Sequence, residues 1–169
     1  MTRSSFPTAV KVVLGESAVA SLAASGAVLL EWPVWAMFIG WISYFTRGVT
    51  ARHGLVNLAC VAGGMAVGVL AAMAMAELSP LLGTLTTGAV VFAVATAVLP
   101  MRHVPVFNNL LGFFLGLVGW FAAHQPPSME AWLTLAGSAA LGATAAWFAS
   151  RLHHHIAATA PHRHGSAAA

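Results

Sequence analysis

The segment Met37-Phe-Ile-Gly-Trp-Ile-Ser-Tyr-Phe45 decides how this chain is organised, because Phe113-Phe-Leu-Gly-Leu-Val-Gly-Trp-Phe121 matches it at an offset of 76 residues. Both segments are apolar, carry a glycine at the fourth position and end in an aromatic pair, so Gly40 aligns with Gly116. Carried outward, the same offset relates residues 12–76 to residues 82–150. The sequence therefore predicts two structural units of similar size.

Six apolar stretches occupy these two units, and most of them approach the ~20 residues that a helix needs to cross a bilayer. They cover about residues 12–30, 34–46, 54–76, 82–99, 107–123 and 131–150. The chain is 59% apolar and only 7% charged, whereas an average soluble domain is about 25% charged. We therefore expect an all-α polytopic membrane protein with six transmembrane helices.

The charged residues alternate between the two sides of this predicted bundle. The seven basic residues lie before the first stretch, in the second and fourth connections, and after the sixth stretch: Arg3, Lys11, Arg47, Arg52, Arg102, Arg151 and Arg163. Glu31, Glu77 and Glu130 occupy the other three connections. Because Lys and Arg favour cytoplasmic loops, both termini are predicted to be cytoplasmic. The basic residues then face anionic lipid, and no nucleic-acid partner is expected.

This pattern also predicts the domain limits. We expect a cytoplasmic N-terminal segment at 1–11, a membrane domain at 12–150, and a flexible His-rich cytoplasmic tail at 151–169. Each unit holds three helices, an odd number, so the second unit starts on the opposite side and the pair forms an inverted repeat. In inverted-repeat transporters, short or Gly- or Pro-interrupted helices mark the solute path. The stretch after Pro33 has this character, since ~13 helical residues reach only ~20 Å of a ~30 Å hydrocarbon core.

The second and fifth helices are therefore predicted to line a solute path. Its candidate residues are Gly40, Ser43, Asn108, Asn109, Gly112 and Gly116. Gly40 and Gly116 would let a solute or a neighbouring backbone come close. The two asparagines either hold a small polar solute or cap the start of the fifth helix. Asn57 is a further polar candidate, for which a helix–helix hydrogen bond is the expected role.

Glu16 and the histidines are the remaining ionisable candidates. Glu16 is the only carboxylate inside a predicted span, where a charge costs at least ~2.5 kcal/mol. It is interpreted as a proton or cation site, or as an interfacial residue near Lys11. The tail histidines are weak metal candidates, because no acid or cysteine accompanies them and a flexible basic tail near lipid is the alternative. They are His153, His154, His155, His162 and His164.

Two segments carry a family resemblance, namely residues 31–45 and residues 110–121 with the Ala- and Gly-rich stretch that follows. They resemble the small bacterial inner-membrane proteins grouped as family 1097 of domains of unknown function. The likeness covers about residues 12–150 and excludes the tail. The family has no established activity or site residues, so the resemblance implies bacterial inner-membrane placement and adds no chemistry.

No nucleophile–base pair, phosphate-binding loop or paired carboxylate site is present in the sequence, so neither an enzyme nor a cofactor is expected. The first hypothesis is a channel or facilitator for a small polar solute, working as a homo-oligomer in the lipid bilayer. A non-transporting membrane scaffold or accessory subunit is the second. A proton-coupled secondary transporter that uses Glu16 is the third.

Overall fold

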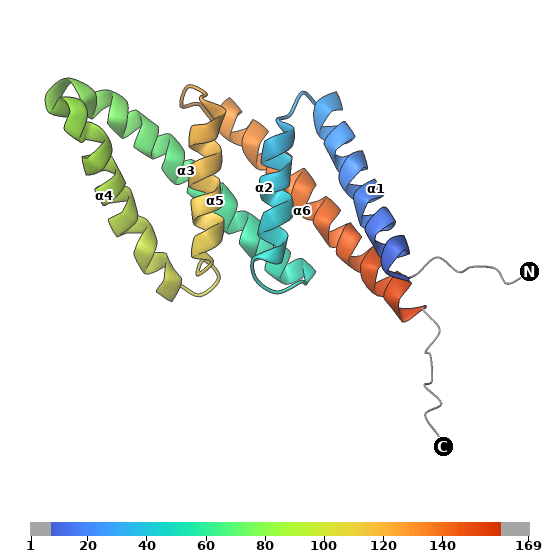
Figure 1. Ribbon diagram of the computed structural model, residues 1–169. Coiled ribbons are helices and arrows are strands. Elements are labelled where there is room, and N and C mark those ends of the chain that lie inside the picture. The colour runs from blue at the N-terminus through green and yellow to red at the C-terminus, as the bar shows by residue number, and fades with distance from the viewer. Residues whose placement is uncertain (1–7, 160–169) are drawn as a thin grey trace, which may run out of the picture.

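The computed structural model describes residues 8–159, and every regular element in that range is a helix (Figure 1). The elements are α1 (Thr8–Leu29), α2 (Val34–Phe45), α3 (Ala51–Leu82), the 3-10 turn η1 (Gly83–Leu85), α4 (Thr86–Val98), the 3-10 turn η2 (Leu99–His103), α5 (Leu110–Ala123) and α6 (Met129–Ala158). The all-α prediction is confirmed. The helix α6 continues past residue 150, where the tail was expected to begin. Residues 1–7 and 160–169, with Arg3, His162 and His164, lie outside the described range.

The short helices α2 and α5 lie next to each other at the centre, and α4 and α1 lie at the two outer edges (Figure 1). The long helices α3 and α6 cross this row obliquely, with α5 packed on α3 and α2 packed on α6. The chain reverses between α3 and α4 at Gly83, whose φ of +50° is a left-handed conformation that glycine adopts at little cost.

Length and surface both indicate that the protein is embedded in a membrane. Three helical runs are long and apolar enough to cross a bilayer: Thr8–Leu29, Ala51–His103 and Met129–Ala158. The helices α2 and α5 are apolar but shorter. Large apolar side chains such as Leu22 and Phe92 are about three-quarters exposed. An apolar surface of this kind requires lipid rather than water around it.

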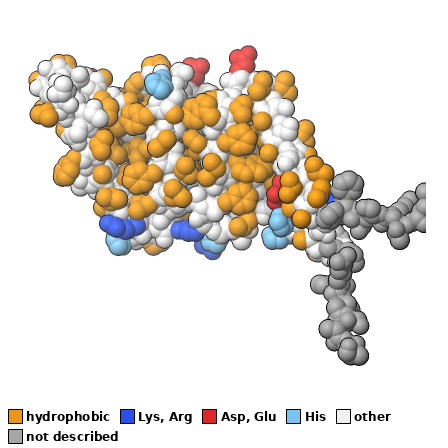
Figure 2. All heavy atoms as spheres, in the orientation of Figure 1, with side chains coloured by type: hydrophobic (Ala, Val, Ile, Leu, Met, Phe, Trp, Pro, Cys, Tyr) orange, Lys and Arg blue, Asp and Glu red, His pale blue; other side chains and the backbone are white. Residues whose placement is uncertain are grey.

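The two ends of the bundle carry opposite charges. The acidic end comprises the α1–α2 and α5–α6 connections, with Glu31 and Glu130. The basic end comprises the α2–α3 and α4–α5 connections, with Arg47 and Arg102. Figure 2 shows acidic side chains along the upper edge of the molecule and Lys and Arg side chains along the lower edge, with apolar side chains between them.

Two close helix crossings hold the centre of the fold together. At the crossing of α2 and α6, a Cβ added to Gly40 would overlap the backbone carbonyl of Ala139, and one added to Gly142 would overlap the carbonyl of Met37. Only glycine lets the two backbones come this close.

The crossing of α5 and α3 is built in the same way. A Cβ on Gly116 would overlap the carbonyl of Val61, and a Cβ on Gly64 would overlap the carbonyl of Phe113. Gly116 follows Gly40 by 76 residues, and Gly142 follows Gly64 by 78 residues. The offset read from the sequence therefore joins residues with the same packing role, and α3 and α6 add a shift of two residues.

Candidate functional site

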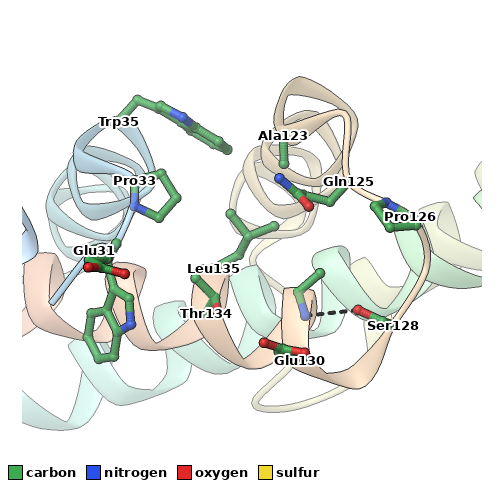
Figure 3. A pocket seen from close by; sticks show the side chains of 12 residues that line it. Glu31, Pro33, Trp35, Ala123, Gln125, Pro126, Ser128, Glu130, Thr134 and Leu135 are labelled. Carbon is green, nitrogen blue, oxygen red and sulfur yellow. Dashed lines mark hydrogen bonds between the residues drawn. The ribbon is translucent and has the colours of Figure 1, made fainter.

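A cavity of about 520 Å³ opens at the acidic end, between the start of α2, the end of α5 and the start of α6 (Figure 3). Its wall combines carboxylate, amide, hydroxyl and aromatic groups. They include Glu31, Trp32, Trp35, Gln125, Glu130 and Thr134. This mixture of apolar surface and a few polar groups is characteristic of small-molecule sites.

The chain shapes this cavity through the way α1 ends and α6 begins. At the end of α1, the backbone N–H of Trp32 donates to the carbonyl of Ala27 (2.8 Å), and that of Glu31 donates to the carbonyl of Val28 (3.0 Å). This is the Schellman pattern, with Glu31 at φ +57° in the position that glycine usually occupies. At the other wall, the hydroxyl of Ser128 caps α6 by accepting from the N–H of Ala131 (3.1 Å).

Buried apolar side chains fill the space beneath the cavity. Met65, Trp120, Leu135 and Ala139 pack there in one cluster, each at most 2% exposed. Leu135 also lines the cavity and therefore forms its floor. The centre of the α2–α5 interface is packed rather than hollow.

A network of polar side chains lies below this cluster, at the basic end. The amide of Asn109 donates to Asn57 Oδ1 (2.8 Å) and to Thr46 Oγ1 (2.7 Å). The amide of Asn57 donates in turn to the backbone carbonyls of Arg47 (3.1 Å) and Tyr44 (3.4 Å). These bonds join the end of α2 to the starts of α3 and α5. No buried side-chain nitrogen or oxygen within residues 8–159 lacks a hydrogen-bond partner.

The glycines predicted to line a path lie against neighbouring helices. Gly40 and Gly116 form the two crossings, so the alternative of a close backbone accounts for their size. A Cβ on Gly112 would be 3.0 Å from the Cβ of Cys60 and 3.3 Å from the carbonyl oxygen of Asn57. All three glycines face α3 or α6 at these contacts.

The polar path candidates all lie in or beside the network at the basic end. Asn109 is 6% exposed and caps α5, since its Oδ1 accepts from the N–H of Gly112 (3.2 Å). Asn108 is exposed and accepts a hydrogen bond from the guanidinium of Arg47. Ser43 is buried and donates to the carbonyl of Gly40 (2.8 Å). Asn57 makes the helix–helix hydrogen bond expected of it.

Glu16 lies away from this interface. Its Oε1 is 2.9 Å from His153 Nδ1, which links α1 to α6 near the basic end. Both side chains are more than a third exposed. Within residues 8–159 no three His, Cys, Asp or Glu residues form a group that could hold a metal ion.

Sequence reasoning missed two parts of the site. Thr46 and Arg47 were not predicted as partners of the asparagines, although they follow directly on the second apolar stretch. The cavity was also missed, because Glu31 and Glu130 were interpreted only as markers of topology. The tryptophans beside Glu31, next to an unusually short helix, were the available signal.

Apolar helices surrounding a packed interface, with polar groups concentrated at the two ends, define a helical membrane-embedded protein. The chain belongs to the family described as protein of unknown function (DUF1097), whose model matches residues 13–154. This confirms the resemblance seen in the two short-helix segments. No curated protein and no solved structure matches the chain.

Proposed function

We propose that this protein is a facilitator that moves a small polar solute along the α2–α5 interface by opening its two ends in turn. One observation carries the proposal: the two ends of the interface have corresponding walls, yet the acidic end is open as a cavity and the basic end is closed by hydrogen bonds.

The correspondence follows from the two crossings. The cavity is bounded by the start of α2, the end of α5 and the start of α6. The network is bounded by the start of α5, the end of α2 and the start of α3. Exchanging the units α1–α3 and α4–α6 converts one description into the other, as in an inverted repeat. In such proteins, an exchange of conformation between the two repeats moves the opening from one side to the other.

The proposed topology has six spans with both termini in the cytoplasm of a bacterial cell, within its inner membrane. It rests on the separation of the basic and acidic ends, because Lys and Arg are retained on the cytoplasmic side. The cavity then opens outward. The short helices α2 and α5 complete the six spans through their flanking connections and the tilt of their neighbours.

The packed centre favours a carrier over a permanently open pore. Leu135, Met65 and Trp120 occupy the line between the cavity and the network. A solute passes only if these side chains and the network rearrange, which limits the rate of transport.

A non-transporting scaffold is the second candidate, and the same packed centre favours it. Its polar groups are satisfied internally, and its glycines serve helix packing. A scaffold needs no rearrangement, so restraining the basic end would leave its function unchanged.

The test is to lock the basic end and measure flux in liposomes. Thr46→Cys and Asn109→Cys replace two side chains in contact across α2 and α5, in a Cys60→Ala background that removes the native thiol. Bridging the two thiols with Hg²⁺, a soft metal that thiolates bind, should stop uptake of small polar solutes. A dithiol should restore it.

The matched control bridges α1 and α6 through Glu16→Cys and His153→Cys, which replace a contacting pair outside the interface. This bridge should leave uptake unchanged. Equal inhibition by both bridges would contradict the alternating path. A wild-type protein that moves no solute in a broad panel would favour the scaffold.

A further inference from the structure

We infer that the cavity at the acidic end binds a small organic cation. This deepens the proposed function by naming a solute class, but the binding site stands on the cavity itself. Its volume of about 520 Å³ falls within the ~300–1,000 Å³ range of small-molecule sites.

The charges on the cavity wall have one sign. Glu31 and Glu130 contribute carboxylates, and no Lys, Arg or His is among the lining residues. Low-dielectric walls around charges of one sign concentrate the opposite ion. An anionic solute would be repelled, and a neutral one would gain nothing from the carboxylates.

The aromatic groups favour an organic cation over a metal ion. Trp32 and Trp35 line the cavity, and Figure 3 shows the ring of Trp35 on the same side as Pro33 and Glu31. The face of an indole ring attracts alkylammonium groups and is the strongest side-chain partner for them. A metal ion needs several close oxygen, nitrogen or sulfur ligands, and no three-residue metal-binding group occurs in residues 8–159.

The two carboxylates differ in how far packing explains them. Glu130 lies in the first turn of α6, where a negative charge stabilises the helix dipole. Glu31 occupies a left-handed position where glycine would be less strained. The cavity gives that carboxylate a use that the end of α1 does not require.

The experiment is calorimetric titration of the full chain in detergent with tetraethylammonium. Wild-type protein should bind this cation, and neither ethanesulfonate nor a neutral polyol should compete. Glu31→Gln should weaken binding by about tenfold, the loss of roughly one charge contact near a surface. Trp35→Leu should also weaken it.

Glu77→Gln is the matched control, because Glu77 is an exposed acid in α3 and does not line the cavity. Its affinity should equal that of the wild type. Glu31→Gly serves as a second variant, since it relieves the backbone strain and should fold at least as well while still losing affinity. The inference is overturned if these glutamate variants all bind alike, if Mg²⁺ displaces the cation at equal concentration, or if no cation binds.

Binding and transport then separate the two proposals. Cation binding without flux would retain this inference and reject the facilitator. Flux of a neutral solute without cation binding would do the reverse.

Discussion

Replacing Gly116 by alanine tests the close crossing that organises the fold. The added Cβ would overlap the carbonyl of Val61 and lie 2.8 Å from the backbone nitrogen of Met65 and 2.9 Å from the Cα of Gly64. All three neighbours are backbone atoms, so no side chain can rotate away, and α5 must move off α3. Overpacking of this kind costs about 1–3 kcal/mol. The upper end applies here, and it is partly offset by the ~1 kcal/mol that alanine gains over glycine in a helix.

The net loss is therefore about 2 kcal/mol, or roughly 4–8 °C in melting temperature for a chain of this size. Thermal unfolding in detergent, followed by circular dichroism, measures it. Gly88→Ala in α4 is the control, because nothing lies within 4 Å of the added Cβ, and its melting temperature should rise slightly. Gly40→Ala should resemble Gly116→Ala. Equal melting temperatures for Gly116→Ala and Gly88→Ala would refute the crossing.

Three further outcomes are expected. Asn57→Leu leaves the carbonyls of Arg47 and Tyr44 without their side-chain donor and should lower the melting temperature by about 4–8 °C, from roughly 2 kcal/mol of unsatisfied groups; an unchanged value would mean that the network adds no stability. Glu16→Gln should leave proteoliposome uptake intact and cost at most ~1 kcal/mol, because the pair with His153 is exposed; abolished uptake would instead favour the proton-coupled alternative. Reporter fusions after Gly48 and after Pro80 should report opposite sides of the membrane, and the same side for both would end the six-span topology.

Local features of the fold could be predicted, and contacts between distant segments could not. Pro33 set the start of α2, and Asn109 was recognisable as a helix cap because both signals act within one turn. The offset between Gly40 and Gly116 indicated related roles, but the partners on α6 and α3 depend on how the helices cross. The His153 partner of Glu16 lies 137 residues away, and nothing in either helix specifies that α1 packs on α6.

The candidate site was harder to predict for the same reason. The network could be anticipated only as separate polar residues, since Thr46, Asn57 and Asn109 come from three helices. The cavity depends on two connections and the start of α6 meeting at one end. An empty volume leaves no periodic pattern in a sequence, and only the aromatic and acidic composition of its rim was readable.

The two glycine crossings also impose an order on biogenesis. When α5 leaves the ribosome, its partner α3 has already been made, so Gly116 can dock at once. By contrast, 99 residues separate Gly40 from Ala139, and at ~5–20 residues per second α2 waits about 5–20 s for α6. Nascent chains stalled before residue 139 should therefore leave α2 accessible to protease, whereas full-length chains should protect it. An α2 protected in both would mean that another helix holds it during synthesis.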